Sequence, residues 1–554
     1  MHISAPPRAG SGAFEAAHAL LSSLIACGLR HLVLAPGSRS APLAYAASAL
    51  AERTSTAFEV HVRHDERSVA FTALGLSRAG ELAAVGTTSG TATAHLLAAA
   101  MEAHHSGIPL VLLTADRPAE LRGTGANQAT YQAGLFSPFT VLNVDLPAPG
   151  AHEASHTDVR LAVDTAARAA HAALESPGPV HLNLGFRDPL AATWATAEHV
   201  EEVLRIPEHA ASADRAGVPL CDLPARTVVV AGDGYDSGRR AGALATRLGL
   251  PLFAEPSSNA RACADVLVPM YPEAIARVMG AEAHELRPRT VIVVGHPTLS
   301  RPVMRQLLGA SDIEVILESS RLEWPDAPRN ASRIIPLIDV ETSSLAEEQS
   351  SYLDAWKELG RELDARGRER LAPQAVAALA VWEACAQDCA PLVLGASSLI
   401  RDLEQHAGSN GARVYANRGL AGIDGTVSMA SGIALAERTR TRVLLGDVSA
   451  IHDLTGFVIG PTEREPELDI VIVDDNGGRI FSGLEHQGAP SSVLERFFTT
   501  PHGVDLASAI EGLGVQVERC VPGELSGRLS TASHNARRRV FFVDIGSERS
   551  GNGV

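Results

Sequence analysis

The chain has 554 residues, of which 45% are hydrophobic and 20% are charged, so several packed domains are expected and wholesale disorder is not. Its formal net charge of −17 argues against nonspecific binding to nucleic acid or to an anionic membrane surface. The six cysteines do not make a disulfide framework; Cys385 and Cys389 lack a second pair to complete a zinc site and are expected to pack on a helix. The N-terminal segment has no signal-peptide core and no apolar run reaches membrane-spanning length, which predicts a soluble, cytoplasmic protein.

Apolar strands alternate with helical segments from Phe14 to about Ala195. Each strand ends in a polar or glycine-containing loop, and four strand–loop–helix units follow one another. This order predicts a doubly wound parallel sheet, in which the loops at the carboxyl ends of the strands carry function. The strands are predicted at residues 31–35, 58–62, 82–87, 108–114 and 179–184.

Two further regions show the same alternation of strands and helices. Residues 193–216 predict a linker, and residues 341–370 predict a polar helical connector. The sequence therefore predicts an α/β fold with three doubly wound parallel-sheet domains, at residues 1–195, 196–370 and 371–554. The order of elements in the first and third domains is similar, as expected of duplicated modules. Further strands are predicted at residues 227–231, 252–255, 291–295, 313–317, 392–395, 413–416, 442–446, 469–473 and 540–544, with a helix near 239–248.

The stretch 468–481 contains the strongest candidate site. Its run of β-branched residues predicts a buried parallel strand, which ends in Asp-Asp-Asn-Gly-Gly at 474–478. Upstream, another strand runs into Gly446 and Asp447, so Asp447 and Asp475 end two strands with a spacing of 28 residues. Oxygen ligands at this edge suit a hard cation, with the Gly477 carbonyl as a third ligand. A helix starting near Ser449 could point its amides at a phosphate.

A second Gly-Asp site competes with this one. Gly232, Asp233 and Gly234 follow a strand, and Asn259 lies 26 residues after Asp233. This segment has a glycine at the third position, but no oxygen cluster and glycine pair follow a long buried strand. We therefore predict that Gly232 to Gly234 form an ordinary turn.

Glu66 and several arginines are weaker candidates from the residues alone. His-Asp-Glu-Arg at 64–67 opens a helix, where capping and compensation of the helix dipole explain the acidic residues equally well. Four arginines in loops or at helix starts indicate a polyanionic substrate, because arginine binds carboxylates in bidentate fashion. Each of them alone could equally form a surface ion pair. These arginines are Arg39, Arg117, Arg401 and Arg418.

The motifs taken together resemble those of the thiamine-diphosphate-dependent enzymes. Within that family, the resemblance is to the branch that acts on 2-oxoglutarate and isochorismate in menaquinone biosynthesis. The match covers both outer domains in order, while the central domain matches only in its place and general pattern. The motifs are Pro-Gly-Ser-Arg-Ser at 36–40, His-Asp-Glu-Arg at 64–67, Thr-Ser-Gly-Thr-Ala at 88–92, Ala-Asp-Arg-Pro at 115–118, Gly-Ala-Asn-Gln at 125–128, Asn-Arg-Gly at 417–419, Gly-Ile-Asp-Gly at 422–425, Gly-Asp at 446–447 and Asp-Asp-Asn-Gly-Gly at 474–478.

The resemblance implies a transferase that decarboxylates 2-oxoglutarate, releases CO2 and adds the remaining unit to isochorismate. Thiamine diphosphate would be held through Mg2+ or Mn2+, with its pyrimidine on the first domain and its diphosphate on the third. Glu66 would hydrogen-bond the pyrimidine and promote its proton transfer, and Ile423 would press between the two cofactor rings. Because the glutamate and the diphosphate site come from different subunits in this family, the protein would be a homodimer or homotetramer.

The same alignment of motifs assigns further residues. Gly446, Asp447, Asp475 and Gly477 would bind the cofactor, the last three through the metal. The alignment departs from the general signature at Val448, where glycine is usual, and at Asp475, where asparagine is commoner and where aspartate adds negative charge at the metal. The substrate residues would be Ser38, Arg39, Arg117, Gln128, Arg301, Ser397, Arg401, Arg418, Ile480, Phe481 and Leu484.

Two alternatives remain beside this interpretation. One is another thiamine-diphosphate-dependent 2-oxoacid decarboxylase or carboligase, against which the arginine set argues. The other is a nicotinamide-dependent oxidoreductase or a nucleotide-binding regulatory module that uses the central domain. It would require a Gly-x-Gly-x-x-Gly turn, and the segment starting at Gly232 lacks the last glycine at the required spacing.

Overall fold

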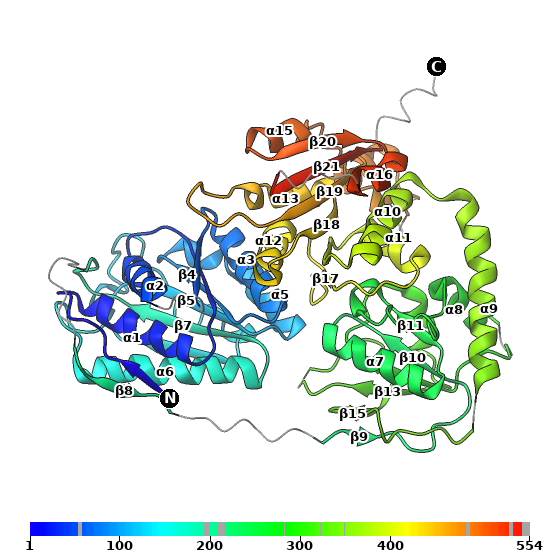
Figure 1. Ribbon diagram of the computed structural model, residues 1–554, viewed down its shortest axis with the longest axis horizontal. Helices are drawn as coiled ribbons and strands as arrows, with labels where there is room; N and C mark the ends of the chain where they lie inside the picture. Colours follow the sequence, from blue (N-terminus) through cyan, green and yellow to red (C-terminus); the bar gives the residue numbers. More distant parts are fainter. Residues whose placement is uncertain are drawn as a thin grey trace. The chain divides into compact units, whose positions relative to one another are not determined.

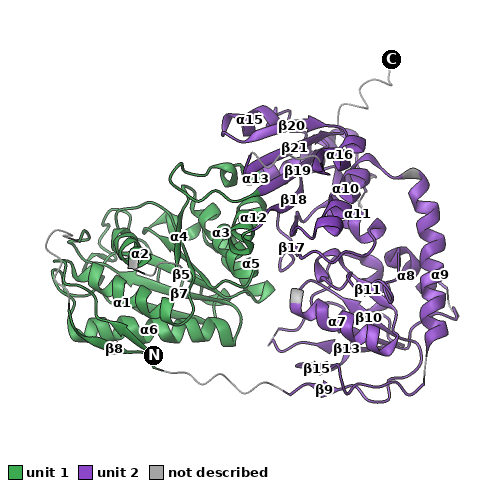
Figure 2. Ribbon diagram, viewed as in Figure 1, with its two compact units in different colours: residues 1–212, 424–438, 452–467 green, residues 213–423, 439–451, 468–554 purple. Residues whose placement is uncertain are grey.

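The computed structural model contains three parallel sheets flanked by helices, an α/β fold (Figure 1). The chain divides into two compact units, which are described separately (Figure 2). Unit 1 comprises residues 1–212, 424–438 and 452–467, and unit 2 comprises residues 213–423, 439–451 and 468–554. The structure describes residues 1–53, 58–192, 200–207, 216–281, 283–321, 323–347, 349–483, 488–530 and 536–545.

Unit 1 is built on a six-stranded parallel sheet in the order β3-β2-β4-β5-β7-β6. Side chains alternate between its two faces, as strand geometry requires: Leu32 and Leu34 enter the core beneath α1, α2 and α6, whereas Val33 enters the core beneath α3 and α5. The strands are β2 (His31–Leu34), β3 (Glu59–Val62), β4 (Ala83–Thr87), β5 (Leu110–Asp116), β6 (Leu142–Leu146) and β7 (Pro179–Gly185), and the helices are α1 (Gly12–Ala26), α2 (Ala41–Arg53), α3 (Glu66–Arg78), α4 (Thr91–Ala94), α5 (Leu97–Ser106) and α6 (His156–Glu175).

Three strands of unit 1 were absent from the sequence prediction. β6 is an edge strand whose sequence, Leu-Asn-Val-Asp-Leu, alternates polar and apolar residues instead of forming an apolar run. β1 (His2–Ser4) pairs in antiparallel fashion with β8 (Val203–Arg205), so part of the predicted linker at 193–216 is a paired strand. The prediction of a linker was wrong at those residues, and residues 193–199 and 208–215 of that segment lie outside the described part of the chain.

The first sheet of unit 2 is a five-stranded parallel sheet in the order β11-β10-β12-β13-β14. Trp356 of α9 is buried in its core and packs edge-to-face on Phe253, with ring centroids 5.0 Å apart. The predicted helical connector at 341–370 contains a helix, α9, only from Ser350 onward, and that helix is also part of this core. The elements are β10 (Thr227–Ala231), β11 (Leu252–Ala254), β12 (Thr290–Val294), β13 (Glu314–Glu318), β14 (Ala331–Ile335), α7 (Tyr235–Leu248), α8 (Tyr271–Met279), α9 (Ser350–Gly367) and the short pair β9 (Val218–Pro219) and β15 (Ile338–Asp339).

The second sheet of unit 2 has six parallel strands in the order β17-β16-β18-β19-β21-β20. Numbered from its own first strand, this order is the same as that of the sheet in unit 1, which confirms the predicted similarity of the first and third regions. The strand order reverses between β16 and β18, the place where open α/β sheets bind ligands. The strands are β16 (Leu392–Leu394), β17 (Val414–Ala416), β18 (Thr441–Gly446), β19 (Leu468–Asp474), β20 (Gln516–Cys520) and β21 (Arg538–Asp544).

The remaining helices of this region divide between the two units. α10 (Pro373–Asp388), α11 (Ser398–His406), α13 (Asp447–His452), α15 (Leu506–Gly512) and α16 (Leu525–Ser530) begin in unit 2, whereas α12 (Thr426–Glu437) belongs to unit 1. All strands of the three sheets lie inside the predicted domain ranges, and the boundaries at 195 and 370 stay predictions. None of the helices in the described residues is long and apolar enough to cross a membrane.

Candidate active site

Asp447 lies at the junction of β18 and α13 and is almost fully buried. Its Oδ1 atom accepts a hydrogen bond from the amide of Val448 (2.8 Å), and its Oδ2 atom accepts one from the amide of Gly477 (2.7 Å). The second strand reaches the same edge because β18 and β19 are paired, with Gly446 opposite Val473. The fold thus brings the two predicted metal-binding segments together, as their positions at strand ends led us to expect.

Glycine at position 477 is required by the backbone. Its φ of +132° is in the region that side chains disfavour, and a Cβ atom there would lie 2.2 Å from the Thr499 carbonyl oxygen. The next amide, of Gly478, donates to the same carbonyl (2.6 Å), and Asn476 before it has a left-handed φ of 59°. The Asn-Gly-Gly turn is therefore held close against the segment that ends at Thr499.

His502 is a neighbour that the sequence did not reveal. Its Nε2 atom lies 2.9 Å from Asp447 Oδ2 and 3.8 Å from Asp474 Oδ1. Ligand atoms of Asp447, Asp474 and His502 all lie within 4.8 Å of one another. No periodic signal links these positions, since His502 follows Asp447 by 55 residues in the chain.

The carboxylates of this cluster repel one another. Burial and the nearby Asp447 charge raise the pKa of Asp475 to about 7. Burial, with the contact to Asp447, raises the pKa of Asp474 to about 6. A divalent cation would relieve this repulsion, and oxygen ligands are those that Mg2+ and Mn2+ prefer. The chemistry of these side chains fits a divalent cation, but the structure groups Asp447 with Asp474 and His502, and the predicted ligand Asp475 is not part of that group.

One of the two departures from the general signature, Val448 in place of glycine, causes no backbone strain. Val448 is the second residue of α13 and is not among the described residues with positive φ, so glycine is not required there. The expected helix at this point begins at Asp447 rather than near Ser449 and is only six residues long.

Other residues of the protein occupy the space next to Gly232 in the competing segment. A Cβ atom on Gly232 would lie 2.0 Å from the Pro297 nitrogen, and Asp233 exchanges backbone hydrogen bonds with His296 (3.0 and 3.1 Å). Asn259 uses its side chain to bind the Val414 amide and carbonyl (2.7 and 2.9 Å). These groups hydrogen-bond to other parts of the protein, which agrees with the interpretation of Gly232 to Gly234 as a turn.

Glu66 is the first residue of α3 in unit 1, and its neighbours take the structural roles of the motif. The Asp65 side chain caps the helix by accepting from the Arg67 amide (2.8 Å), and Arg67 Nη2 donates to the His452 carbonyl (2.6 Å). Across the described residues, the half-buried Glu66 carboxylate has no hydrogen bond or ion pair. Capping is therefore performed by Asp65, which leaves Glu66 available to a ligand.

Close helix packing fixes α3 in unit 1. A Cβ atom on Gly432 of α12 would lie 2.0 Å from the Thr72 carbonyl, and one on Gly75 of α3 would lie 2.0 Å from the Met429 carbonyl. Glycine on both helices lets their backbones touch. The Asp453 carboxyl adds to this frame by accepting from the amide and hydroxyl of Ser428 (2.8 and 3.0 Å), and burial raises its pKa to about 6.

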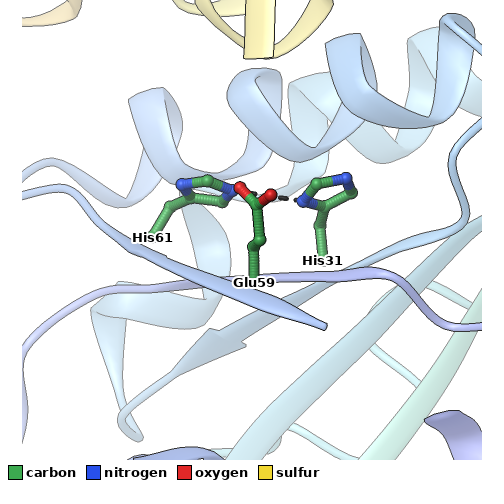
Figure 3. Close-up of side chains that lie close together, drawn as sticks. All are labelled: His31, Glu59 and His61. Carbon is green, nitrogen blue, oxygen red and sulfur yellow. Dashed lines mark hydrogen bonds between the residues drawn. The ribbon is translucent and has the colours of Figure 1, made fainter. Parts of the chain in front are cut away.

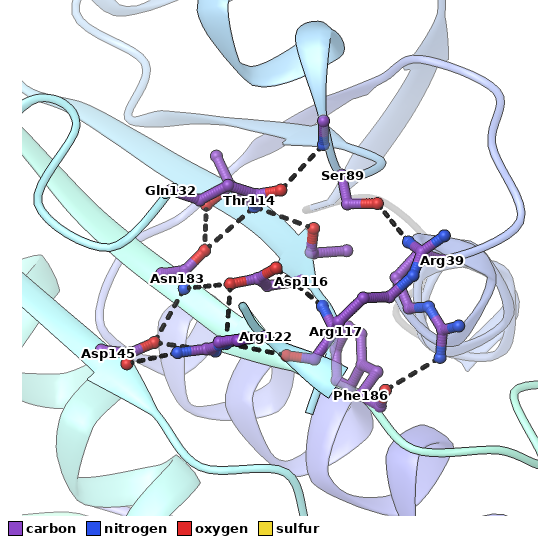
Figure 4. Close-up of polar contacts among 12 residues, drawn as sticks. Arg39, Ser89, Thr114, Asp116, Arg117, Arg122, Gln132, Asp145, Asn183 and Phe186 are labelled. Carbon is purple, nitrogen blue, oxygen red and sulfur yellow. Dashed lines mark hydrogen bonds and ion pairs between the residues drawn. The ribbon is translucent and has the colours of Figure 1, made fainter. Parts of the chain in front are cut away.

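Two predicted substrate residues of unit 1, Arg39 and Arg117, lie close together in Figure 4. Arg117 donates to the Ser89 hydroxyl and to the Asn127 carbonyl (2.6 Å), and the Gln128 side chain donates to the Ser89 carbonyl (2.9 Å). Arg39 donates to the Phe186 carbonyl (2.9 Å) and pairs with the Asp188 carboxylate (3.3 Å). Burial lowers the pKa of Arg117, and the positive charge of Arg39 lowers it further. The two guanidinium groups therefore lie close enough to repel each other. Ser38 lies next to Arg39 and is exposed.

A buried network holds Arg117 in place (Figure 4). The Asp116 carboxylate accepts from the Arg117 amide (2.7 Å) and from Asn183 Nδ2 (2.9 Å), and it pairs with Arg122 (3.1 Å). Gln132 Nε2 donates to Asn183 Oδ1 (3.2 Å), while its Oε1 accepts from the Gly90 amide (2.8 Å). Asn183 and Gln132 were not predicted as site residues, because they act through contacts between distant segments.

The predicted substrate residues of unit 2 form a second set. Arg418 is buried, and its Nε and Nη2 atoms donate to the Thr298 hydroxyl (3.0 and 2.6 Å). Burial and the charges of Arg418 and Arg301 lower the pKa of Arg401, with Glu404 opposing the shift. The three arginines thus contribute positive charge to one region of this unit. Ser397 is the N-cap residue of α11, and its hydroxyl lies 3.9 Å from the Cβ position of Gly446.

The predicted apolar wall is partly described. Ile480 and Phe481 belong to the short helix η8 (Arg479–Gly483), directly after the Asn-Gly-Gly turn. Phe481 is partly exposed and packs on Phe498, with ring centroids 6.1 Å apart. Ile423 is half-buried in unit 2. Leu484 lies outside the described residues.

One cluster outside this site has metal-ligand chemistry. His31, Glu59 and His61 lie together on β2 and β3, and His31 Nδ1 is 3.2 Å from His61 Nε2 (Figure 3). Both carboxylate oxygens of Glu59 are paired with arginines, Arg438 at 2.6 Å and Arg464 at 2.7 Å. Burial lowers the pKa of His31 to about 4 and holds that of His61 well below its usual value. The positive charges of Arg438 and Arg464 would repel a cation bound here. The two histidines are therefore a packed pair of neutral side chains.

The parallel sheets, the acidic strand-end turn and the unpaired glutamate define a thiamine-diphosphate-dependent enzyme. Residues 14–135 match the family described as "Thiamine pyrophosphate enzyme, N-terminal TPP binding domain". The chain is 44% identical over 510 residues, 90% of either chain, to the 2-succinyl-5-enolpyruvyl-6-hydroxy-3-cyclohexene-1-carboxylate synthase of Kineococcus radiotolerans. It is 39% identical to the synthase of that name from an Arthrobacter species, over 99% of this chain and 92% of that one. It is 40% identical to the Paenarthrobacter aurescens synthase, over 97% of this chain and 94% of that one. The chain belongs to the 2-succinyl-5-enolpyruvyl-6-hydroxy-3-cyclohexene-1-carboxylate synthase family.

Proposed function

We propose that this protein decarboxylates 2-oxoglutarate and joins the remaining four-carbon unit to isochorismate, with release of CO2, as a step of menaquinone biosynthesis. The identity of 44% to a synthase of this name, over nine tenths of both chains, is the observation that carries the proposal. The reaction balances without an oxidant or reductant, because one carbon–carbon bond breaks as CO2 leaves and another forms to the ring of isochorismate.

Asp447, Asp475 and the Gly477 carbonyl would hold Mg2+ or Mn2+, and through it the diphosphate of the cofactor. When bound, thiamine diphosphate supplies a nucleophilic carbon and accepts the electron pair that decarboxylation releases. The buried position of Asp447 and the glycine-dependent turn at Gly477 support this role, since both restrict where the ligand oxygens can lie. His502 would orient the Asp447 carboxylate, since it lies 2.9 Å from Oδ2.

Glu66 would hold a proton at the pyrimidine ring of the cofactor. Its carboxylate has no competing partner in the described residues, because Asp65 caps the helix. Such proton transfer by a positioned side chain contributes roughly 100-fold to 10,000-fold to rate.

The arginines would bind the carboxylates of the two substrates. 2-Oxoglutarate and isochorismate carry four carboxylates between them, and each unit of the structure offers one arginine whose side chain donates to neutral partners, Arg117 in unit 1 and Arg418 in unit 2. Arg117 is bonded to the Ser89 hydroxyl and Arg418 to the Thr298 hydroxyl, so neither charge is neutralised at its hydrogen bonds. Arg39, Arg301 and Arg401 would add further charge. Ser38, Gln128 and Ser397 would donate hydrogen bonds, and Ile480, Phe481 and Leu484 would form an apolar wall.

We further propose that the active protein is a homodimer or a homotetramer, because the enzymes it resembles take the glutamate and the diphosphate site from different subunits. Sedimentation of the purified protein would measure its oligomeric state, and a fully active monomer would contradict this part of the proposal.

The experiment is turnover with defined components. The purified protein, stripped of metal and cofactor, should consume 2-oxoglutarate and isochorismate together only when thiamine diphosphate and Mg2+ or Mn2+ are both returned. Consumption of 2-oxoglutarate at the same rate without isochorismate would indicate a simple decarboxylase and would overturn the proposal.

A further inference from the structure

Glu255 is a buried carboxyl group to which the proposed function assigns no role. It follows β11, and its amide still pairs with the Ala231 carbonyl (2.9 Å) of the neighbouring strand. Its side chain is 3% exposed. A carboxyl group that is removed from water is costly unless its oxygens are bonded, so the contacts of this group indicate what it is for.

Only one of its two oxygens is bonded. Oε1 accepts hydrogen bonds from two successive backbone amides, of Thr298 (2.6 Å) and Leu299 (2.7 Å). Oε2 is buried and has no hydrogen-bond partner in the described residues. Two short bonds to adjacent amides fix the orientation of the backbone at Thr298.

Thr298 is the residue that contacts Arg418. Its hydroxyl oxygen accepts from both Nε and Nη2 of the guanidinium (3.0 and 2.6 Å). Because the backbone of Thr298 is held by Glu255, the hydroxyl is presented to Arg418 at a fixed place. The chain of contacts therefore runs from Glu255 through Thr298 to an arginine of the proposed substrate site.

We propose that Glu255 is a positioning residue for substrate binding, which sets the Arg418 guanidinium through the backbone and hydroxyl of Thr298. This inference rests on the proposed function, since Arg418 is a substrate residue only in that proposal.

The charges around Glu255 are consistent with this role. Burial and the neighbouring Glu404 raise the pKa of Glu255 to about 8, and Arg418 opposes that shift. The hydrogen bonds from the Thr298 and Leu299 amides also lower this pKa, so burial and Glu404 act against the three groups that favour the charged carboxylate. Arg261 and Tyr271 are the other ionisable groups that interact with it.

The test compares variants along the chain of contacts. Thr298→Val removes the acceptor for Arg418 while keeping the shape of the side chain, and Thr298→Ser should restore it. Glu255→Gln keeps an acceptor oxygen, whereas Glu255→Ala removes it. The matched control is Glu318→Ala in the same sheet, since Glu318 is also a buried strand-end glutamate, whose Oε2 accepts from the Ile338 amide (2.9 Å), but it has no hydrogen bond or ion pair to Thr298 or Arg418.

Two measurements are made on each variant of the full-length protein. The first is the rate at which phenylglyoxal modifies Arg418, followed by peptide mass spectrometry. The second is KM for each substrate and kcat in the loaded enzyme. We expect Thr298→Val and Glu255→Ala to speed the modification of Arg418 severalfold and to raise one KM by about tenfold with kcat changed little, as for loss of one or two hydrogen bonds to a charged group. Thr298→Ser, Glu255→Gln and Glu318→Ala should stay within about threefold of the wild type.

The outcomes separate the two proposals. If Arg418 is modified at the wild-type rate in Thr298→Val and in Glu255→Ala, the positioning role is wrong, whatever the turnover. If Glu318→Ala changes Arg418 as much as Glu255→Ala does, the effect is general destabilisation and the role is again wrong. If the wild-type protein does not join the two substrates, the proposed function fails, while the modification rates still decide whether Glu255 places Arg418.

Discussion

Replacement of Gly477 by alanine tests most directly whether the Asn-Gly-Gly turn binds a metal. The new methyl group would lie 2.2 Å from the Thr499 carbonyl oxygen, about 1 Å inside ordinary van der Waals contact. The residue would also have to keep a φ of +132°, and strain of that kind costs about 1–3 kcal/mol. The turn can escape both costs only by moving, which displaces the carbonyl proposed to bind the metal.

The strain lowers the affinity for the metal, because the turn must return to its original, strained shape when the metal binds. At about 1.4 kcal/mol for each factor of ten, we expect Gly477→Ala to weaken binding of Mg2+ in the presence of thiamine diphosphate by roughly 10-fold to 100-fold. Calorimetric titration of the metal measures it.

The control is Gly483→Ala, which lies at the end of the following short helix and has no heavy atom within 4 Å of its Cβ position. It should bind the metal as the wild type does. A Gly477→Ala protein with affinity within about threefold of the wild type would refute the reasoning about this turn.

Three further predictions concern single residues. Glu66→Gln should lower kcat by at least about 100-fold while leaving metal and cofactor affinity within a few-fold, as separate titration and turnover assays would reveal; a fully active variant would remove Glu66 from the mechanism. Asp475→Asn should weaken Mn2+ binding, because it removes one negative charge next to Asp447, and an unchanged dissociation constant in calorimetry would count against this. His31 has a pKa of about 4 when folded and about 6.5 when unfolded, so the unfolded chain binds more protons between these values and stability falls as the pH drops through that window. The free energy of unfolding falls by roughly 3 kcal/mol in total across this window. His31→Asn retains a partner for His61 but cannot titrate, so its melting temperature should fall less between pH 7.5 and 5 than that of the wild type.

Local sequence patterns predicted the buried strands well. β10 has the predicted bounds, Thr227–Ala231, and β19 extends the predicted strand by one residue at each end. Strands buried on both faces are continuous runs of β-branched and other apolar residues, and such runs are visible without any knowledge of their neighbours. The edge strands β6 and β20 were missed because one side of each has no strand partner and their sequences mix polar and apolar residues.

The candidate site also has features that local sequence predicted and features that only the structure revealed. Residue type and spacing alone made Asp447, Asp475 and Gly477 candidates, because ligand residues at strand ends form a recognisable pattern, whereas Glu66 received its role from the family resemblance. The sequence also indicated the family, through motifs whose order in the chain is specific.

Only the tertiary structure brought His502 to Asp447, and Glu255 through Thr298 to Arg418. It also divided the roles within one motif, since Asp65 caps the helix and leaves Glu66 unpaired. The physical reason is that a hydrogen bond depends on where two groups lie in space. Residues far apart in the chain reach that distance only when the sheets that carry them have formed, so residue type and local spacing determine which groups can act, and packing decides which of them meet.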